Sequence, residues 1–448
     1  MAILSEKNAK ELLTKVLSYS KADQCQCRLN GAQSGNIRYA RNTVTTAGET
    51  SDVTLAVSSS FGKRTGVATI NEFDNASLEK VVRRSEELAK LAPENPEHMP
   101  HWGPQKYLKA NNFAKSTAMT EPAYRAKAAD QSITPSKKND LVSSGFLMDN
   151  VNFTAIINKN GLFAYNASTD VSFSVTIKTS DGKGSGWVSR DYIDIDKLDT
   201  NKVSSIAIDK AIRSADAKAL EPGKYTVILE PDASVDLLNN MVSSMSQRRA
   251  DEGRSFLSRK IEAGEKNGKT NKLGEKMFDP MVNIYSDPQH PEVATSPFAR
   301  NGHRLEKIDW IKGGKIQNMY NSAFWAKKTG SEYVPGTLAG TQIIMEGGKE
   351  SLEDMIKSTR RGILVTRLWY IRQMDPQTLL YTGLTRDGTF YIEDGKIKYP
   401  IKNFRFNESP IVMLNNIEAL GKPQRTNGCM IPPMKIRDFT FTSSSDAV

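Results

Sequence analysis

The sequence has few of the residues that crosslink a fold or bind metals. Its 448 residues include only three cysteines, Cys25, Cys27 and Cys429, and four histidines. Three cysteines cannot build the disulfide framework of a small secreted scaffold, and they fit a reducing compartment. No apolar run approaches the roughly 18–20 residues that a membrane-spanning helix needs, and the first residues do not resemble a signal peptide. We therefore expect a cytoplasmic protein that has no membrane segment.

The charge balance is modestly basic. The sequence contains 61 Lys and Arg against 51 Asp and Glu, a net charge of +10. The basic residues cluster over 248–276 and 357–372, where acidic or apolar residues are interleaved with them. This mixing favours a solvated surface, or one that attracts acidic peptides, over a nucleic-acid interface.

Periodic patterns in the first half predict both helices and strands. Apolar residues at helical spacing predict helices, and strict alternation predicts strands. Turn dipeptides separate the strands, as Asn160-Gly161 does. The predicted helices cover 3–17, 75–91, 121–130 and 198–217, and the predicted strands lie within 52–70, 153–165, 171–177 and 187–188.

The second half shows many short strand patterns and few helical ones. A change in composition at 220–223 predicts a boundary between domains 1–220 and 221–448, with a Pro- and Lys-rich connection over about 93–140. The predicted fold is therefore α+β, with an N-terminal α/β domain that has a long sheet and helices, and a mostly-β C-terminal domain. A strand over 225–229 precedes a helix from Pro231 that has one apolar face, and 247–276 reads as a long excursion. Later short strands are expected over 281–285, 340–345, 378–384, 389–393, 396–399 and 438–442.

The familiar catalytic motifs are missing. No H-E-x-x-H, P-loop or G-x-S-x-G sequence occurs. His98 and His101 have ligand-like spacing but lie among prolines, which favours a solvated linker, and His290 and His303 fall in turns or loops. Cys25 and Cys27 share a face if their segment is a strand.

Residues 359–372 mix arginines with Trp369 and Tyr370. Such a mixture can serve nucleic acid, but the alternation favours a strand with one wet face. The exposed edge or face of that strand could add an extended peptide by main-chain pairing.

Several stretches together resemble the TldD/PmbA family. They are RGILVTRLWY at 361–370, DPQTLLYTGLTRDG at 375–388, FRFNESP at 404–410, PMKIRDFTFTS at 433–443 and SFLSRK at 255–260. The resemblance implies TldD-like and TldE (PmbA)-like subunits that act together as a zinc metallopeptidase on unfolded or extended peptides. Some members are described as modulators of DNA gyrase. TldD-like subunits carry H-E-x-x-x-H on the helix after the first C-terminal strand, with a cysteine from further along the chain.

This sequence departs from that motif. The alignment with the family places Asn239 and Asn240 at the first His and the Glu, and Ser244 at the second His. Amides and hydroxyls are poor zinc ligands beside imidazole, and Asn240 cannot act as a base. Cys429 aligns with the family cysteine as a possible residual ligand, and Arg248 and Arg249 are weak candidates for holding peptide.

The leading hypothesis is a non-catalytic TldE-like subunit that binds no cofactor of its own. It would assemble with a TldD-like subunit that holds the zinc, and would act on peptide or unfolded polypeptide as a homo- or hetero-oligomer. One alternative is an active metallopeptidase that uses Cys429 with His290 or His303. The other is a nucleic-acid or gyrase-associated binding protein.

Overall fold

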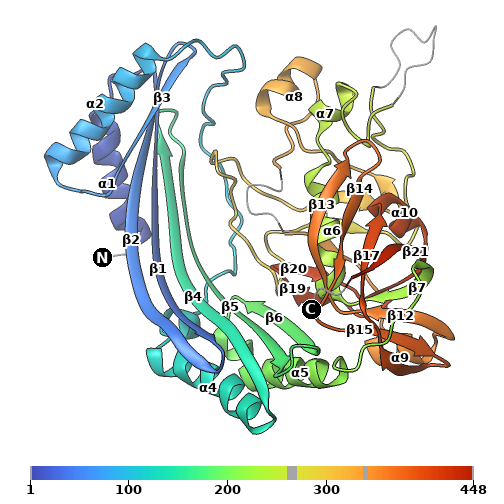
Figure 1. The fold of residues 1–448 in the computed structure, drawn as a ribbon. Helices are drawn as coiled ribbons and strands as arrows, with labels where there is room; N and C mark the ends of the chain where they lie inside the picture. The colour runs from blue at the N-terminus through green and yellow to red at the C-terminus, as the bar shows by residue number, and fades with distance from the viewer. Residues whose placement is uncertain (1–2, 260–269, 337–341, 446–448) are drawn as a thin grey trace, which may run out of the picture.

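The computed structural model describes residues 3–259, 270–336 and 342–445. They form two lobes, an N-terminal one built on long strands and a C-terminal one built on short strands (Figure 1). The predicted α+β class is therefore confirmed. No helix among the described residues has both the length and the apolar character needed to cross a membrane.

One antiparallel sheet organises the N-terminal lobe. Its strands follow the order β3-β2-β1-β4-β5-β6. They are β1 Gln24–Ala40, β2 Thr43–Phe61, β3 Arg64–Ile70, β4 Leu141–Asn158, β5 Phe163–Thr179 and β6 Ser185–Tyr192. Buried and more exposed residues alternate along β1, as a strand with one covered face requires. Cys25 and Cys27 lie on its buried face, with their sulfur atoms 3.9 Å apart, so the strand interpretation is correct.

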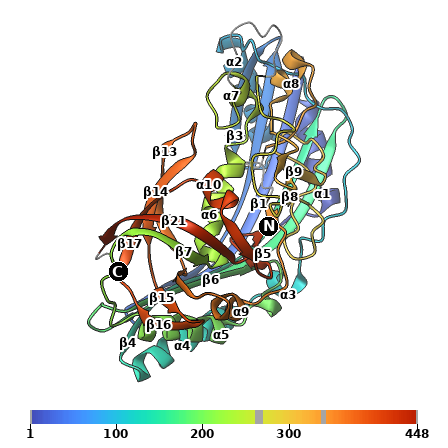
Figure 2. The same cartoon turned by 90° about the vertical axis from the view of Figure 1, so that its right-hand side faces the viewer.

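Helices cover one face of this sheet in two groups (Figures 1 and 2). The helices α1 and α2 pack near one end over a core that includes Leu13, Leu29 and Val82. The helices α4 and α5 pack near the other end over a core that includes Leu147 and Phe173. The helices of this lobe are α1 Glu6–Ser18, α2 Asn75–Leu91, α3 Lys115–Ala118, α4 Pro122–Lys138 and α5 Thr200–Arg213, with a 3-10 turn at Ile195–Lys197. The four predicted helices are confirmed, and α4 extends beyond its predicted end.

The proline-rich connection is not a solvated linker. Trp102 packs against His303 and Tyr333, with ring centroids 4.7 and 5.3 Å away, and the Tyr107 hydroxyl donates to the Gly302 carbonyl at 2.7 Å. The segment thus connects the lobes by packing as well as by sequence. Its aromatic residues explain the difference, because they bury apolar surface that prolines alone would leave in water.

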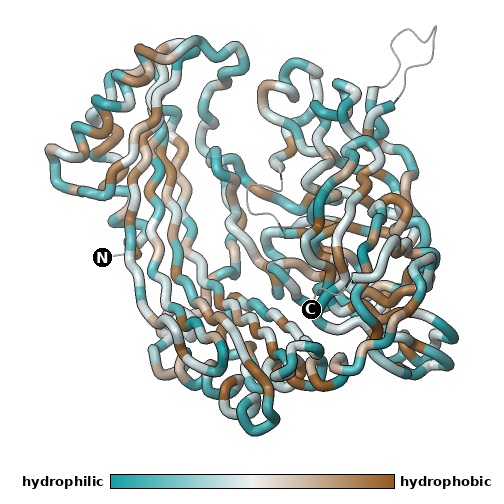
Figure 3. Tube along the Cα trace, viewed as in Figure 1, coloured by the Kyte–Doolittle hydropathy of each residue, from teal (hydrophilic) through white to brown (hydrophobic). Residues whose placement is uncertain are grey.

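In the C-terminal lobe, the helix α6 packs between two sheets. The larger, nine-stranded sheet runs β13-β14-β17-β21-β7-β12-β15-β16, with β18 beside β21, and the smaller runs β10-β9-β8-β11-β20-β19. Apolar residues gather in the interior of this lobe (Figure 3).

The strands of the larger sheet are β7 Gly223–Leu229, β12 Arg361–Val365, β13 Leu368–Asp375, β14 Leu380–Thr385, β15 Thr389–Glu393, β16 Lys396–Pro400, β17 Asn403–Glu408, β18 Ile417–Leu420 and β21 Met434–Ser445. Those of the smaller sheet are β8 Ile284–Ser286, β9 Ile308–Lys312, β10 Lys315–Ile316, β11 Ile344–Met345, β19 Gln424–Thr426 and β20 Cys429–Ile431. The helices described in this lobe are α6 Pro231–Ser243, α7 Gln247–Asp251, α8 Ala323–Thr329, α9 Leu352–Lys357 and α10 Pro410–Asn415.

The predicted single strand within 359–372 is wrong, because the structure divides it. β12 lies between β7 and β15, whereas β13 forms the far edge of the sheet. The chain turns between them because the Thr366 hydroxyl donates to the carbonyls of Asp387 and Gly388. Arg367 also pairs with the Asp387 carboxylate at 2.7 Å. Parts of the predicted excursion 247–276 and strand 340–345 lie outside the described residues.

Ion pairs join the two lobes around the start of α6. Arg190 on β6 pairs with Asp232 on α6 at 3.1 Å, and Lys210 on α5 pairs with Glu230 at 2.7 Å. Arg425 on β19 pairs with Asp191 at 2.8 Å. The Lys210 and Glu230 side chains are only 12% and 13% exposed, so solvent screens their attraction little. The pairs of Arg190 and Lys210 hold the start of α6 against the N-terminal lobe, and the pair of Arg425 holds β19 against β6.

Candidate functional site

The helix α6 presents two different faces. Pro231 occupies its first turn, where the missing N–H costs no helical hydrogen bond. The predicted apolar face is confirmed, since all its members are buried in the core: Val235, Leu238, Met241, Val242 and Met245. On the other side, Asp236 is exposed and Asn239 and Asn240 are half-buried. Polar groups therefore line the part of α6 that the two sheets leave uncovered.

Asn239 and Cys429 meet although 190 residues separate them. The Asn239 amide nitrogen lies 3.6 Å from the Cys429 sulfur, and the thiol lies 3.7 Å from the amide oxygen. Cys429 is 2% exposed, and burial raises the pKa of its thiol. The thiol is therefore protonated at neutral pH and pairs with a neutral amide.

The residues at this place do not fit a zinc ion. Zinc binds thiolate, imidazole or carboxylate ligands, whereas α6 offers two amides and Cys429 offers a protonated thiol. Ser244 ends the helix, and its hydroxyl donates to the Asn240 carbonyl at 2.7 Å. Within the described ranges, no group of three or more His, Cys, Asp or Glu residues could hold a metal. No step of a metal-assisted reaction follows from these donors.

A small groove of about 260 Å³ is lined by residues of α6 that precede Asn239 and by Thr426 and Asn427, which precede Cys429. It lies between the β13 edge and the β19–β20 hairpin, and α6 forms part of its wall. The lining comprises Trp187, Ser189, Asp232, Val235, Asp236, Arg367, Leu368, Trp369, Tyr370, Ile371, Thr426 and Asn427. Arg367 stacks on Trp187, with its guanidinium carbon 3.9 Å from the ring centroid. The groove thus combines aromatic surfaces with a guanidinium whose charge is already paired with Asp387.

Asp236 supplies the negative charge in the groove. The residue as a whole is exposed, and partial burial of its carboxyl group by the surrounding protein raises its pKa. Arg367 opposes that shift, and the nearby Asp232 adds to it. An acidic group in this setting accepts hydrogen bonds from a peptide backbone or pairs with a basic side chain.

The structure places the predicted peptide-binding arginines elsewhere. Arg248 pairs with Glu97 at 2.9 Å and Glu252 at 3.0 Å, and it lies over Trp325 at 5.0 Å. Arg249 is exposed on α7. Neither arginine lines the groove beside α6.

None of the four histidines lines the groove beside α6. His98 and His101 are half-buried on the connecting segment, where burial and the neighbouring His98 lower the pKa of His101. The His290 ring accepts from the Glu292 amide at 3.2 Å. His303 packs edge-on against Trp102 and Tyr333, each at 4.7 Å, so its role is structural packing.

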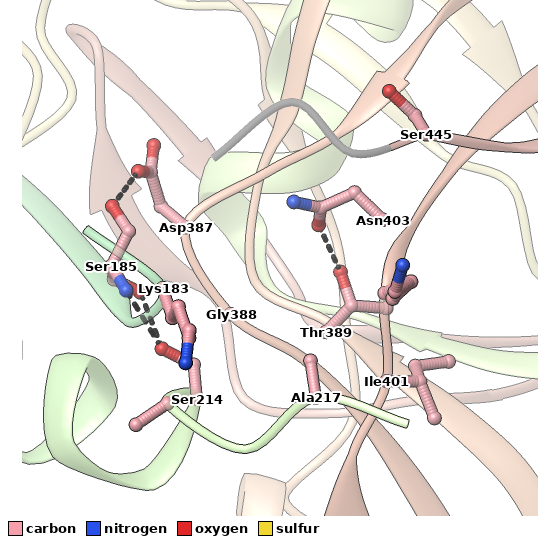
Figure 4. Close-up of a pocket in the computed structure, with 12 residues that line it drawn as sticks. Lys183, Ser185, Ser214, Ala217, Asp387, Gly388, Thr389, Ile401, Asn403 and Ser445 are labelled. Atoms are coloured by element: carbon pink, nitrogen blue, oxygen red, sulfur yellow. Dashed lines mark hydrogen bonds between the residues drawn. The ribbon is translucent and has the colours of Figure 1, made fainter. Parts of the chain in front are cut away.

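A second cavity, of about 350 Å³, marks the junction of the lobes (Figure 4). Ser185 donates to Asp387 at 2.5 Å, and Ser214 donates to the Ser185 carbonyl at 2.9 Å. Thr389 donates to Asn403 at 2.9 Å on the opposite wall. Of these three bonds, the one between Ser185 and Asp387 connects β6 to the C-terminal lobe. The other two lie within single lobes, so the cavity marks a contact between the lobes.

Three groove residues were not predicted from the sequence: Trp187, Asp236 and Arg367. Trp187 comes from the N-terminal lobe, and nothing in its local pattern marks it. Asp236 could have been found, because it stands three residues before Asn239 and therefore on the same side of a helix.

Fold and groove together define a two-lobed α+β protein with a polar groove on a central helix. Models of the PmbA/TldA metallopeptidase family match it in three parts: domain 1 over residues 25–89, the central domain over 111–215 and the C-terminal domain over 222–443. The chain belongs to this PmbA/TldD family, and the resemblance inferred from the sequence is confirmed.

Curated relatives are distant. A protein named metalloprotease from Methanothermobacter thermautotrophicus is 21% identical over 295 residues, which cover 61% of this chain and 60% of the relative. Metalloprotease PmbA from Escherichia coli O157:H7 is 27% identical over 178 residues, 37% of each chain. The matches therefore span less than two thirds of either relative's length.

Solved structures share the whole fold. The crystal structure of TldE from Thermococcus kodakarensis superposes with a TM-score of 0.85 at 18% identity and covers 98% of this chain and 100% of that one. A candidate modulator of a DNA gyrase from Thermotoga maritima gives 0.84 at 16% identity, with 97% and 100% covered. At these identities the likeness establishes the fold alone.

Proposed function

We propose that this chain is a non-catalytic, TldE-type subunit of a TldD/TldE-type metallopeptidase, which holds an extended peptide while a TldD-like subunit supplies the zinc. The observation that carries the proposal is the contact between Asn239 and Cys429. The family resemblance implies metal ligands at these two positions. Here an amide and a protonated thiol form a hydrogen-bonded contact with each other instead.

The edge strand β13 supports the peptide-holding role. Among the strands that the structure describes, it pairs only with β14, so its outer edge has main-chain groups that can pair with another strand. Tyr370 has φ of 55° within an irregular stretch of that pairing. Because Trp369 and Tyr370 also line the groove, a peptide added along β13 would place its side chains against aromatic surfaces.

The decisive experiment combines metal analysis with reconstitution. The purified chain is expected to contain no stoichiometric zinc, to co-purify with a TldD-like subunit, and to change peptide cleavage by that subunit. Stoichiometric zinc that is lost in Cys429→Ala would instead support an active metallopeptidase. Salt-dependent DNA binding without assembly would support the nucleic-acid alternative.

A restored motif tests the geometric basis of the proposal. In Asn239→His, Asn240→Glu, Ser244→His, imidazole replaces the amide that now lies beside the Cys429 thiol. We expect this variant to bind roughly one zinc ion per chain at neutral pH, because a thiolate and imidazoles are the donors zinc prefers. The same variant carrying Cys429→Ala is the matched control and should bind zinc more weakly. Equal affinity in the two variants would mean that Cys429 is not a residual ligand.

A further inference from the structure

A polar chamber of about 600 Å³ separates the inner face of the N-terminal sheet from residues 294–300. Cross-strand rows form its floor. Asn30, Thr154 and Asn166 oppose one another across β1, β4 and β5, and Asn152 and Ser168 form the next row. The helices cover the opposite face of this sheet (Figure 1). A row of amides and hydroxyls at this place is not explained by the packing of the core.

Two arginines in the chamber have no acidic partner among the described residues. Arg28 on β1 and Arg300 both line it, and neither has an ion pair in the part of the chain that the structure describes. The Nε atom of Arg28 is buried without a hydrogen-bond partner. Burial lowers the pKa of Arg28, and the positive charge of Arg300 adds to the effect. Buried donors are normally satisfied. The unpaired Nε atom of Arg28, with the exposed Arg300 lining the same chamber, therefore indicates a binding site for an anion.

The third arginine of the chamber, unlike Arg28 and Arg300, has an acidic partner. Arg425 pairs with Asp191 at 2.8 Å and is thus neutralised within the protein. At the same end, Asp170 accepts from Asn150 at 2.6 Å and Asn152 at 3.3 Å. Burial raises the pKa of Asp170. With Arg425 neutralised by Asp191, the two positive charges of Arg28 and Arg300 and the negative charge of Asp170 leave the chamber one net positive charge. A single carboxylate balances that charge, whereas a phosphate dianion exceeds it.

We propose that this chamber binds a carboxylate group of a peptide through Arg28 and Arg300, with the amide and hydroxyl rows of the sheet as additional donors. A guanidinium donates two parallel N–H bonds to a carboxylate. The identity of the ligand as a peptide rests on the proposed function. The β19–β20 hairpin borders both sites, since Arg425 lines the chamber while Thr426 and Asn427 line the groove beside α6.

Peptide binding to the full chain tests the proposal. Three N-acetylated pentapeptides, titrated into the full chain by isothermal titration calorimetry, serve as probes: penta-alanine with a free C-terminus, the same peptide as its C-terminal amide, and an amide in which glutamate replaces the last alanine. We expect one or both of the charged peptides to bind about tenfold or more tightly than the neutral amide, as hydrogen bonds between charged groups allow. Tight binding of the free acid alone identifies a C-terminal carboxylate, and tight binding of the glutamate peptide identifies an acidic side chain.

The variants localise the effect. Arg28→Gln combined with Arg300→Gln should abolish the preference for charged peptides. Arg300→Gln alone should weaken it, and this exposed position is expected to tolerate substitution. Arg38→Gln is the matched control, because Arg38 is exposed on the same strand but does not line the chamber. Equal binding of all three peptides by the unmodified chain, their failure to bind, or a preference that survives in the double variant would overturn the proposal. Zinc content and assembly with a TldD-like subunit are measured separately and decide the proposed function.

Discussion

Removing the buried cation Arg125 should destabilise the N-terminal lobe strongly. Arg125 on α4 is 5% exposed and donates to both carboxylate oxygens of Asp149, at 2.6 and 2.9 Å. Asp149 on β4 is also 5% exposed. A third bond, 2.7 Å long, reaches Glu49 on β2. One guanidinium thus connects a helix to two strands.

The expected loss follows from the charge that remains. In Arg125→Met the apolar part of the side chain is kept, but Asp149 stays buried without its cation. Breaking a buried ion pair in this way costs about 3–5 kcal/mol. For a cooperative unit of 150–250 residues, 1 kcal/mol shifts the midpoint by roughly 2–4 °C. We therefore expect the first thermal transition to fall by roughly 6 °C or more.

Thermal unfolding followed by circular dichroism measures this shift. Arg64→Met is the control, because its pair with Glu94 is 3.8 Å long and largely exposed; such surface pairs contribute about 0–1 kcal/mol. Arg125→Met with Asp149→Leu should recover much of the loss, since apolar residues can replace a buried pair. If Arg125→Met and Arg64→Met melt within about 2 °C of each other, the reasoning about the buried charge is refuted.

Three further predictions concern packing, pH dependence and thiol reactivity. Gly186→Val should displace α5 and lower the melting temperature, because a Cβ atom there would lie 2.1 Å from the Ala207 carbonyl oxygen. Gly48→Val is the control and should change the melting temperature little, because a Cβ atom at that position meets nothing within 4 Å. Asp236→Asn should gain stability relative to the unmodified chain as pH rises above about 4, because a carboxyl whose pKa is raised by folding favours the folded state only while it is protonated. Thermal melts at pH 4 and pH 7 measure the difference in melting temperature between the two proteins. The same difference at both pH values would contradict the prediction. Cys429 should react with iodoacetamide at pH 7.5 only after denaturation, because it is buried and its pKa is raised, and mass spectrometry of labelled peptides would reveal any rapid native labelling.

Local patterns identified most elements of the fold. The predicted helix over 75–91 matches α2 residue for residue, and the strand over 389–393 matches β15. Short-range rules suffice there, because the spacing of apolar residues alone fixes which face is buried. The prediction of a single strand over 359–372 was wrong for the opposite reason. The alternation of these residues continues across Thr366, but the turn at that place depends on Asp387 and Gly388, which are distant in sequence.

The candidate site, like the fold, could be predicted from the sequence only in part. The sequence supplied Asn239, Asn240, Ser244 and Cys429 through the family resemblance, and the apolar face of α6 through periodicity. It could not supply the groove, because the groove needs Trp187 from one lobe and Arg367 from the other. It also could not show that Arg248 is held by Glu97, which lies 151 residues earlier.

By itself, the sequence determined the class of fold, the family and the residue types on α6, because each depends on which side chains follow one another along the chain. Only the tertiary structure decided that Asn239 meets Cys429, that Arg28 and Arg300 line one chamber, and that β13 is an edge. The physical reason is that hydrogen bonds and charge interactions act over a few ångströms in space, whatever number of residues separates the partners.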